Sequence, residues 1–365
     1  WYPTRRVETH MLEGLIAGPQ SHLSDALVNA IPSGTSISAG GIELSDHVAK
    51  VSLNGTLPSD DRGKQLMAWE ISQTLQRSGR VNSVEINVGG EVLPSSGLPS
   101  QPSFDLDSAV ALNSNGLVRV DGRSVSTRIL PIAPSSSASL PAVSPVSSSL
   151  LAWREDDRLI LVDSSTNATR VVDGSEGQYS PSIDRFGWVW DIPQGGNLRA
   201  SRIDGQNLAI ASENQSLNGV SAVRVSPDGA RALLLRQVGG STSAWIAGIE
   251  RRGSGEPIAL TDPEPLAGLS TGVDDVSWAG RSTVVAVRQG GLRAGNDQVD
   301  EVSLVTVPVG GFPSVLALPT GTQRLSAGSS SATMVIRGKD GNYQVRSGAL
   351  WQSLEGNLRD VNFPG

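Results

Sequence analysis

The first ninety residues carry two patterns of apolar positions, one with helical spacing and one with strand spacing. Val7, Met11 and Leu15 recur every four residues and predict a helix that Gly18 and Pro19 end. Further helices are predicted over 21–30 and 60–77, and strands over 35–44, 49–53 and 84–88. Helices and strands mixed in this order predict a small α+β domain over residues 1–93.

A turn at residues 225–229, VSPDG, is the clearest repeated feature of the rest of the chain. Pro227 fixes φ at the first corner of the turn, and the side chain of Asp228 can hydrogen-bond to its own backbone. Gly229, which has no side chain, avoids a steric clash where the chain leaves the turn. Weaker copies begin near residues 143, 179, 276 and 325, and each is followed by short apolar runs. A repeat of roughly 40 to 50 residues with about four short strands is typical of a β-propeller blade.

The two ends of this repetitive region complement each other. Residues 109–112, 117–120 and 125–130 are three predicted strands without a leading turn, whereas 361–365, VNFPG, is a turn with no strands after it. Joined, they make one blade, and a ring closed by a strand from each end has no unpaired sheet edge. We therefore predict an all-β propeller over 105–365, six-bladed and closed by the C-terminal strand. The alternative is a β-sandwich with irregular loops.

Composition and charge narrow the class of protein. Hydrophobic residues make up 38% of the 365 residues, which indicates a globular chain, and residues 94–104, rich in Pro and Ser, predict a linker. The net charge of −7 argues against a general nucleic-acid binder, which needs a basic face. Cysteine is absent, so disulfides, thiolate nucleophiles and Cys-ligated metals are excluded. The first residue is Trp1, so we expect a fragment or a processed chain, with any signal or anchor upstream.

The residues that usually carry catalysis are scarce. His10, His22 and His47 are the three histidines, they match no metal-binding spacing, and none lies in the predicted propeller. A nucleophile elbow, a Ser-His-Asp set and a phosphate-binding loop are all missing from the sequence. The acidic groups at 155–157 and 274–275 are expected in solvated turns. We therefore predict no catalytic, cofactor-binding or metal-binding residues and no enzymatic activity, and the partner-binding residues stay undefined.

Two further stretches contain candidate site residues. Residues 182–190, SIDRFGWVW, resemble the Asp-box of sialidases, but the glycine is one residue too far from the aspartate, so Trp188 and Trp190 are expected to pack within a blade. Residues 289–300 interrupt a predicted blade and contain Arg293, Asp297 and Asp300. This insertion is either a recognition loop or a surface loop without a function. It lacks the alternating acidic ligands and the final Glu of a calcium-binding loop.

Three segments of the first domain resemble a known family. LEGLIAGP at 12–19, IPSGT at 31–35 and VAKVSLNG at 48–55 are similar to the GerMN domain of spore-germination and cell-envelope proteins. A GerMN-like domain followed by a propeller resembles the actinobacterial lipoprotein family LpqB. The resemblance implies an extracytoplasmic protein, held at the cell membrane by a lipidated cysteine upstream of Trp1. It also implies association with the extracytoplasmic domain of the sensor histidine kinase MtrB, and modulation of the MtrAB two-component system in cell-wall homeostasis and division.

Two other functions remain open from the sequence. One is a protein that binds cell-wall glycan or peptide, and the other is a hydrolase that uses a pair of carboxylates on the propeller. Neither requires a cofactor, and no nucleic acid is expected as a partner.

Overall fold

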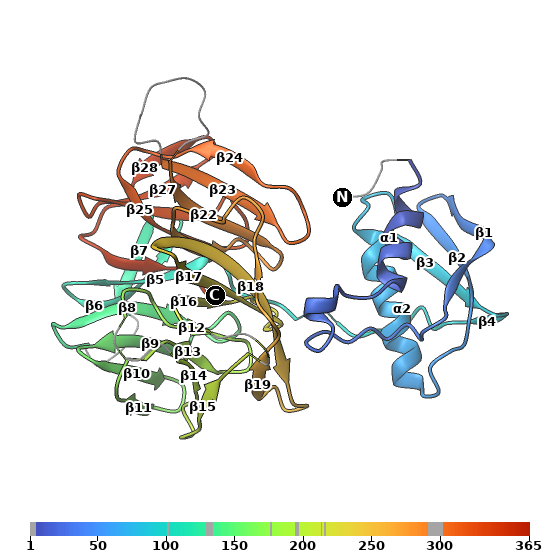
Figure 1. Ribbon diagram of the computed structural model, residues 1–365, viewed down its shortest axis with the longest axis horizontal. Helices are drawn as coiled ribbons and strands as arrows, with labels where there is room; N and C mark the ends of the chain where they lie inside the picture. The colour runs from blue at the N-terminus through green and yellow to red at the C-terminus, as the bar shows by residue number, and fades with distance from the viewer. Residues whose placement is uncertain are drawn as a thin grey trace. The chain divides into compact units, whose positions relative to one another are not determined.

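The structure, a computed structural model, describes residues 5–100, 102–128, 134–175, 177–193, 197–212, 214, 217–290 and 302–365 (Figure 1). The chain divides into two compact units, Trp1–Pro102 and Ser103–Gly365. Each unit is described by itself below.

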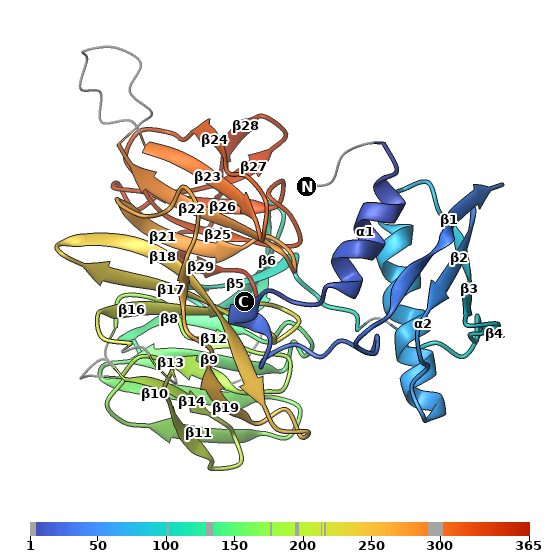
Figure 2. The same cartoon turned by 45° about the vertical axis from the view of Figure 1, so that its right-hand side comes forward.

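The described residues of the first unit form a four-stranded sheet with two α-helices. Its elements are α1 (Val7–Ile16), η1 (Ser21–Leu23), β1 (Ser36–Ser45), β2 (Val48–Asn54), α2 (Asp61–Gln76), β3 (Ser83–Val88) and β4 (Glu91–Val92). The strand order is β1-β2-β3-β4, with β2 and β3 parallel and connected through α2. Both helices lie on the same side of this sheet (Figure 2). The predicted α+β class is therefore correct for this unit.

The core of the first unit follows from the periodicity of α2. The side chain of Asp60 accepts a hydrogen bond from the backbone N–H of Gly63 at 2.8 Å and caps the helix. Met67, Ile71 and Leu75 are fully buried against apolar side chains of β2 and β3. These three positions share one helical face, so the helix buries an unbroken apolar stripe.

The helix predicted over 21–30 is wrong, because only the short 3₁₀ turn η1 forms there. Val28 is 92% exposed, so the segment lacks a continuous apolar face. Oδ1 of Asn29 instead accepts from the N–H of Ile31, two residues on, and such local side-chain bonds compete with helix formation. Nδ2 of Asn29 donates to the carbonyl of Leu15 in α1.

The second unit contains, within its described residues, six antiparallel sheets. The sheet nearest its N-terminus combines β29 (Arg359–Asn362), β5 (Ser108–Asn113), β6 (Gly116–Asp121) and β7 (Ser124–Arg128). The next sheet contains β8 (Ala138–Val143), β9 (Leu150–Glu155), β10 (Arg158–Asp163) and β11 (Ala168–Val172). The third contains β12 (Ser182–Ile183), β13 (Val189–Asp191), β14 (Leu198–Ser201) and β15 (Asn207–Ile210).

The remaining three sheets follow the same order of consecutive strands. The fourth contains β16 (Val220–Val225), β17 (Arg231–Val238), β18 (Ser241–Arg251) and β19 (Pro257–Leu260), with β20 (Glu264–Pro265) paired to β18. The fifth contains β21 (Val273–Trp278), β22 (Thr283–Gln289), β23 (Val302–Pro308) and β24 (Ser314–Ala317). The sixth contains β25 (Thr322–Ala327), β26 (Met334–Gly338), β27 (Tyr343–Ser347) and β28 (Leu350–Ser353).

One edge strand of each sheet faces a strand of the neighbouring sheets. These strands are β8, β12, β16, β21, β25 and β29; each contacts the next, and β29 in turn contacts β8. In the sheet that joins the two ends of the unit, Arg359 of β29 pairs with Leu112 of β5, and Asn362 pairs with Val110. Strands from both ends of the unit therefore share one sheet.

The turns that follow β8, β12, β16, β21 and β25 are each closed by one recurring backbone hydrogen bond. In the fourth sheet the N–H of Ser226 donates to the carbonyl of Arg231 at 2.8 Å, and in the third the N–H of Asp184 donates to the carbonyl of Trp188 at 2.9 Å. The turn of the third sheet thus starts at Asp184, and its placement at residues 179–181 was wrong. The sequence Tyr-Ser-Pro at 179–181 resembles Val-Ser-Pro at 225–227, but it comes before β12 and not after it.

The turn after β16 is held by the side chain of Asp228. Its Oδ1 accepts from the Oγ of Ser226 at 2.5 Å and from the N–H of Ala230 at 3.0 Å, and its Oδ2 accepts from Nη2 of Arg231 at 2.7 Å. Burial raises the pKa of Asp228, but the Arg231 charge and these hydrogen bonds outweigh it. The pKa of Asp228 therefore lies below its ordinary value of 3.8.

We expect Asp228→Asn to lower stability at neutral pH and to matter less in acid. A carboxylate with a lower pKa in the folded state stabilises the fold above the unfolded pKa, and this contribution disappears as pH falls through the folded pKa. The difference in free energy of unfolding between wild type and variant should therefore shrink below about pH 4. Urea denaturation of the intact chain from pH 3 to 7 measures it. A difference that stays constant over this range would contradict the assignment. Asp121→Asn, at an exposed position of β6, is the control.

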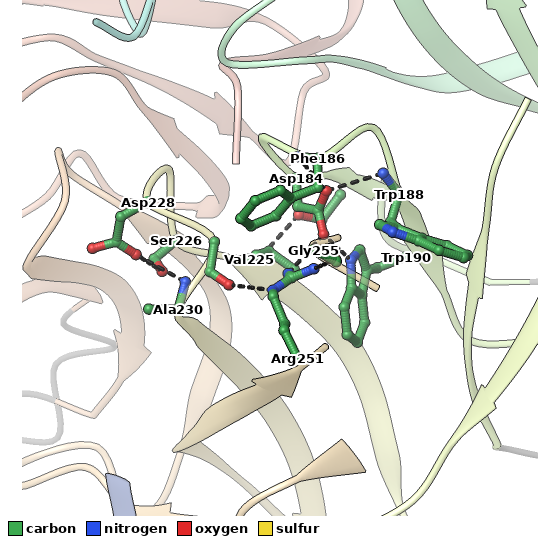
Figure 3. A network of polar contacts seen from close by, with 12 residues as sticks. Asp184, Phe186, Trp188, Trp190, Val225, Ser226, Asp228, Ala230, Arg251 and Gly255 are labelled. Atoms are coloured by element: carbon green, nitrogen blue, oxygen red, sulfur yellow. Dashed lines mark hydrogen bonds and ion pairs between the residues drawn. The ribbon is translucent and has the colours of Figure 1, made fainter. Parts of the chain in front are cut away.

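A buried ion pair joins the third and fourth sheets (Figure 3). Asp184 is fully buried; its Oδ2 accepts from Nη2 of Arg251 at 2.7 Å and from Nε1 of Trp190 at 2.9 Å. Its Oδ1 accepts from the N–H groups of Phe186 and Trp188 at 2.9 Å and 3.0 Å. Because Trp188 and Trp190 are also fully buried in this core, the predicted packing role of both tryptophans is confirmed.

The ring of Phe186 fits between this ion pair and two glycines. Arg251 lies 4.6 Å from the centre of the Phe186 ring. A Cβ on Gly255 would lie 2.3 Å from the ring and one on Gly229 would lie 2.9 Å from it, and both glycines have positive φ, 83° and 76°. Close approach and backbone conformation therefore both require glycine at these positions. The Gly of the VSPDG turn makes room for the ring of the neighbouring sheet.

Candidate functional site

A cavity of about 100 Å³ lies among the facing edge strands of the second unit. It is lined by residues from β8, β16, β21, β25, β26, β27 and β29 and from the segment before β12: Leu140, Gln178, Tyr179, Ser180, Arg224, Asp275, Arg324, Leu325, Ser326, Val335, Arg337, Tyr343, Asp360, Val361 and Asn362. Three of these side chains are arginines and two are aspartates. Charged groups are rarely gathered inside a fold without a reason, so this cavity is the candidate site.

Arg224, on β16, is the most deeply placed cation. It is 6% exposed, and its Nη1 donates to the carbonyl of Ser180 at 2.5 Å. The carbonyl of Arg224 accepts from Nε1 of Trp278 at 2.9 Å, which fixes the backbone beside it. Burial lowers the pKa of Arg224, and the nearby Asp275 carboxyl opposes the shift.

Asp275 lies opposite, on β21, and is 3% exposed. Its Oδ2 accepts from the N–H of Leu325 and its Oδ1 from the N–H of Val276, both at 3.0 Å. Burial raises the pKa of Asp275, with Arg224 and Arg324 acting against that rise. The acidic pair at 274–275 was expected in a solvated turn, and that expectation is wrong for Asp275. The pair belongs to a strand, so one of the two aspartates points inward.

Within the described residues, no nitrogen of Arg224 or Arg324 approaches Asp275 within 4.0 Å. The carboxylate therefore meets backbone N–H groups directly and the two guanidinium groups only through their electric field. This arrangement leaves side-chain donors of the arginines directed to the cavity rather than consumed by an ion pair.

Aromatic rings support the two remaining arginines. Arg324 lies 4.2 Å from the ring centre of Tyr179, whose hydroxyl donates to the carbonyl of Asp274 at 2.9 Å. Arg337 lies 6.0 Å from the ring centre of Tyr343. In the described part of the chain, the guanidinium of Arg337 has no hydrogen bond and no ion pair. Ring faces thus help to position both cations. Nη1 of Arg324 also donates to the carbonyl of Asp274 at 3.5 Å, whereas the guanidinium donors of Arg337 remain available within the described residues.

Two irregular strand positions shape the opposite wall. Leu140 of β8 and Asp360 of β29 have φ of 53° and 52°, and each lies where the strand register shifts. The N–H of Leu140 donates to Oδ2 of Asp360 at 3.0 Å, and the hydroxyl of Tyr343 accepts from the N–H of Asp360 at 2.6 Å. Left-handed backbone at non-glycine residues is strained and is concentrated at functional sites.

None of these cavity residues was predicted as a site from the sequence. Arg224 and Arg324 stand in short apolar strands just before a turn, and an inward arginine there looks the same as an outward one. The sequence signal that could have found them is one charged residue, Arg224, Asp275 or Arg324, within each of the strands β16, β21 and β25. The three histidines, His10, His22 and His47, belong to the first unit: His10 contacts Glu13, and His47 contacts the carbonyl of Arg80.

The other residues considered as sites from the sequence lie apart from this cavity or outside the described residues. Glu155, at the end of β9, accepts from Nε1 of Trp153 and the N–H of Ser135, so it is engaged in local contacts. Arg293, Asp297 and Asp300 lie outside the described residues. Among the residues the structure describes, no three His, Cys, Asp or Glu side chains are grouped as metal ligands. No helix in the described ranges has the length and apolar character needed to span a membrane.

Residues 111–364 match the profile of a family described as the lipoprotein LpqB beta-propeller domain, and residues 1–94 match a family described as sporulation and spore germination. The chain belongs to the LpqB lipoprotein family. The curated protein Lipoprotein LpqB of Streptomyces avermitilis is 30% identical over 196 residues, which are 51% of this chain and 31% of that protein. The matched region thus spans about a third of the LpqB relative.

The similarity to solved structures is weak. A chain in the crystal structure of a nidogen/laminin complex has a TM-score of 0.49 and 9% identity, with 71% of this chain and 98% of that chain covered. A putative TolB from Agrobacterium tumefaciens has a TM-score of 0.44 and 11% identity, with 72% and 100% covered. The assignment to the LpqB family rests on the profile match and not on these structures.

Proposed function

We propose that the second unit of this LpqB-family chain is a six-bladed β-propeller closed by β29. Six sheets in the described residues, the succession of contacts from β8 through to β29 and back, and the pairing of β29 with β5 support this proposal. Closure by strands from both ends of a propeller removes the unpaired edges that would otherwise promote aggregation.

The proposed domain limits are 1–93 for the GerMN-like domain, 94–104 for the linker and 105–365 for the propeller. The two compact units meet between Pro102 and Ser103, and the two family matches end at residue 94 and begin at 111. These three boundaries fall within or next to the proposed linker, which supports the division.

We further propose that the chain is a non-catalytic accessory lipoprotein at the extracytoplasmic face of the cell membrane. In this role it binds the extracytoplasmic domain of the sensor histidine kinase MtrB and modulates the MtrAB two-component system. The observation that carries the proposal is the presence of both family domains in one chain, in the order GerMN-like domain then LpqB propeller. The cavity favours binding over hydrolysis, because Asp275 is engaged by two backbone N–H groups and faces cations rather than a second free carboxylate.

The kinase association is tested with the intact chain and the purified extracytoplasmic domain of MtrB. We expect saturable binding in a surface-based titration and a change in the autophosphorylation rate of full-length MtrB in lipid nanodiscs. The extracytoplasmic domain of an unrelated sensor kinase serves as the control and should not bind. Absence of binding together with unchanged autophosphorylation would refute the proposal.

A further inference from the structure

The polar cavity of the second unit holds more positive than negative charge. Arg224, Arg324 and Arg337 line it together with only two carboxylates, Asp275 and Asp360. Both carboxylates already accept backbone hydrogen bonds, from Leu325 and Val276 for one and from Leu140 for the other. A cavity with one excess positive charge and unused guanidinium donors is suited to a monoanion.

We propose that this cavity binds the carboxylate group of a peptide, with Arg224, Arg324 and Arg337 as the recognising side chains. This site is independent of the kinase association proposed above, and either can be correct without the other.

The size of the cavity sets the size of the bound group. A cavity of about 100 Å³ has room for several water molecules. That space accommodates a carboxylate and its neighbouring carbons, but not a whole peptide. Gln178, which lines the cavity, is exposed, so the site opens to solvent and the rest of a peptide can remain outside.

The chemistry of the walls favours a carboxylate over a phosphate. Arginine binds both planar carboxylates and phosphates through paired N–H donors. The side chains of Leu140, Val335 and Val361 add apolar surface suited to the carbon atoms next to a carboxylate.

The arginines are also held in place before any ligand arrives. The rings of Tyr179 and Tyr343 lie against Arg324 and Arg337, and Arg224 is fixed by its bond to the carbonyl of Ser180. Side chains that are already ordered lose little conformational freedom when they bind, which strengthens recognition by small ligands.

The test is a titration of the intact chain with N-acetyl-alanyl-alanine, compared with the same peptide carrying a C-terminal amide. Ligand-observed NMR or calorimetry at low salt provides the readout. We expect saturable binding of the free carboxylate, weakened by about tenfold or more for the amide because charge-assisted hydrogen bonds are lost. Added salt should weaken binding of the carboxylate. Equal binding of the two peptides would overturn the proposal.

Variants of Arg337 separate recognition from folding. The side chain of Arg337 has no hydrogen bond in the described structure, so Arg337→Ala should leave the melting temperature nearly unchanged and weaken carboxylate binding by about tenfold. Arg337→Glu should abolish binding. Arg123, exposed in the turn between β6 and β7, supplies the control Arg123→Ala with the same loss of charge and no loss of binding. Unchanged binding in both Arg337 variants would overturn the proposal.

Inorganic phosphate and acetate distinguish the kind of anion. Acetate should compete with the peptide, because it presents the same group. If phosphate binds more tightly than either carboxylate, the assignment to a carboxylate is wrong.

Discussion

Deleting residues Leu358–Gly365 is expected to abolish the cooperative unfolding transition of the second unit. Leu358, Val361 and Phe363 are each less than 9% exposed and belong to one apolar core with β5 and β6. At about 2 kcal/mol for each buried side chain, the deletion removes about 6 kcal/mol. A typical domain has a total stability of about 5–15 kcal/mol, so little would remain.

The deletion also leaves groups in the rest of the unit without partners. The N–H of Leu140 loses Asp360, and the Oγ of Ser326 loses the N–H of Phe363, which it accepts at 2.9 Å. The inner edge of β5 loses its pairing with β29 and becomes a free strand edge. We therefore expect aggregation of the truncated chain in addition to the loss of stability.

Near-ultraviolet circular dichroism during urea denaturation measures this effect, because most tryptophans lie in the second unit. Arg359→Ala is the matched control: Arg359 is exposed on the same strand, and its removal should change the free energy of unfolding by less than about 0.5 kcal/mol. If the truncated chain unfolds with an unchanged midpoint, β29 does not close the ring.

The strands of the second unit were predictable because each apolar run is short and bounded by turn residues. The runs predicted at 109–112 and 117–120 lie within β5 and β6. The turn prediction was wrong where two segments have similar sequences but different backbone conformations. Ser180 and Pro181 look like a copy of Ser226 and Pro227, yet the equivalent turn begins at Asp184, which has no proline after it.

The cavity could not be predicted, because its residues come together only when the sheets are arranged around it. Arg224 and Arg324 are a hundred residues apart, and Asp360 reaches Leu140 across 220 positions of sequence. The local sequence around Arg224 and Arg324 does not indicate on which face of β16 or β25 the side chain lies. Asp275 was expected in a solvated turn, but it lies in β21 with its carboxyl buried near cations.

Asp184→Ala is expected to destabilise the second unit by about 3–5 kcal/mol, since it leaves a buried charge without its partner. Arg251 has a side chain only 10% exposed, and Asp184 is its ion-pair partner. The same substitution removes the acceptor for Nε1 of Trp190 and for the two backbone N–H groups of the turn. Glu256→Ala, which breaks the exposed pair with Arg252, is the control and should cost less than about 1 kcal/mol.

A double-mutant cycle shows whether the ion pair itself is responsible. Arg251→Met leaves the hydrogen bonds of Asp184 to the turn and to Trp190 intact but removes its countercharge. If the pair carries the effect, the double variant Asp184→Ala with Arg251→Met should be more stable than the sum of the single losses predicts, because no unpaired charge remains buried. Strictly additive losses in urea denaturation would mean that the turn hydrogen bonds of Asp184 dominate. The third and fourth sheets would then be held together by their apolar core around Trp188 and Trp190, and the ion pair would contribute little.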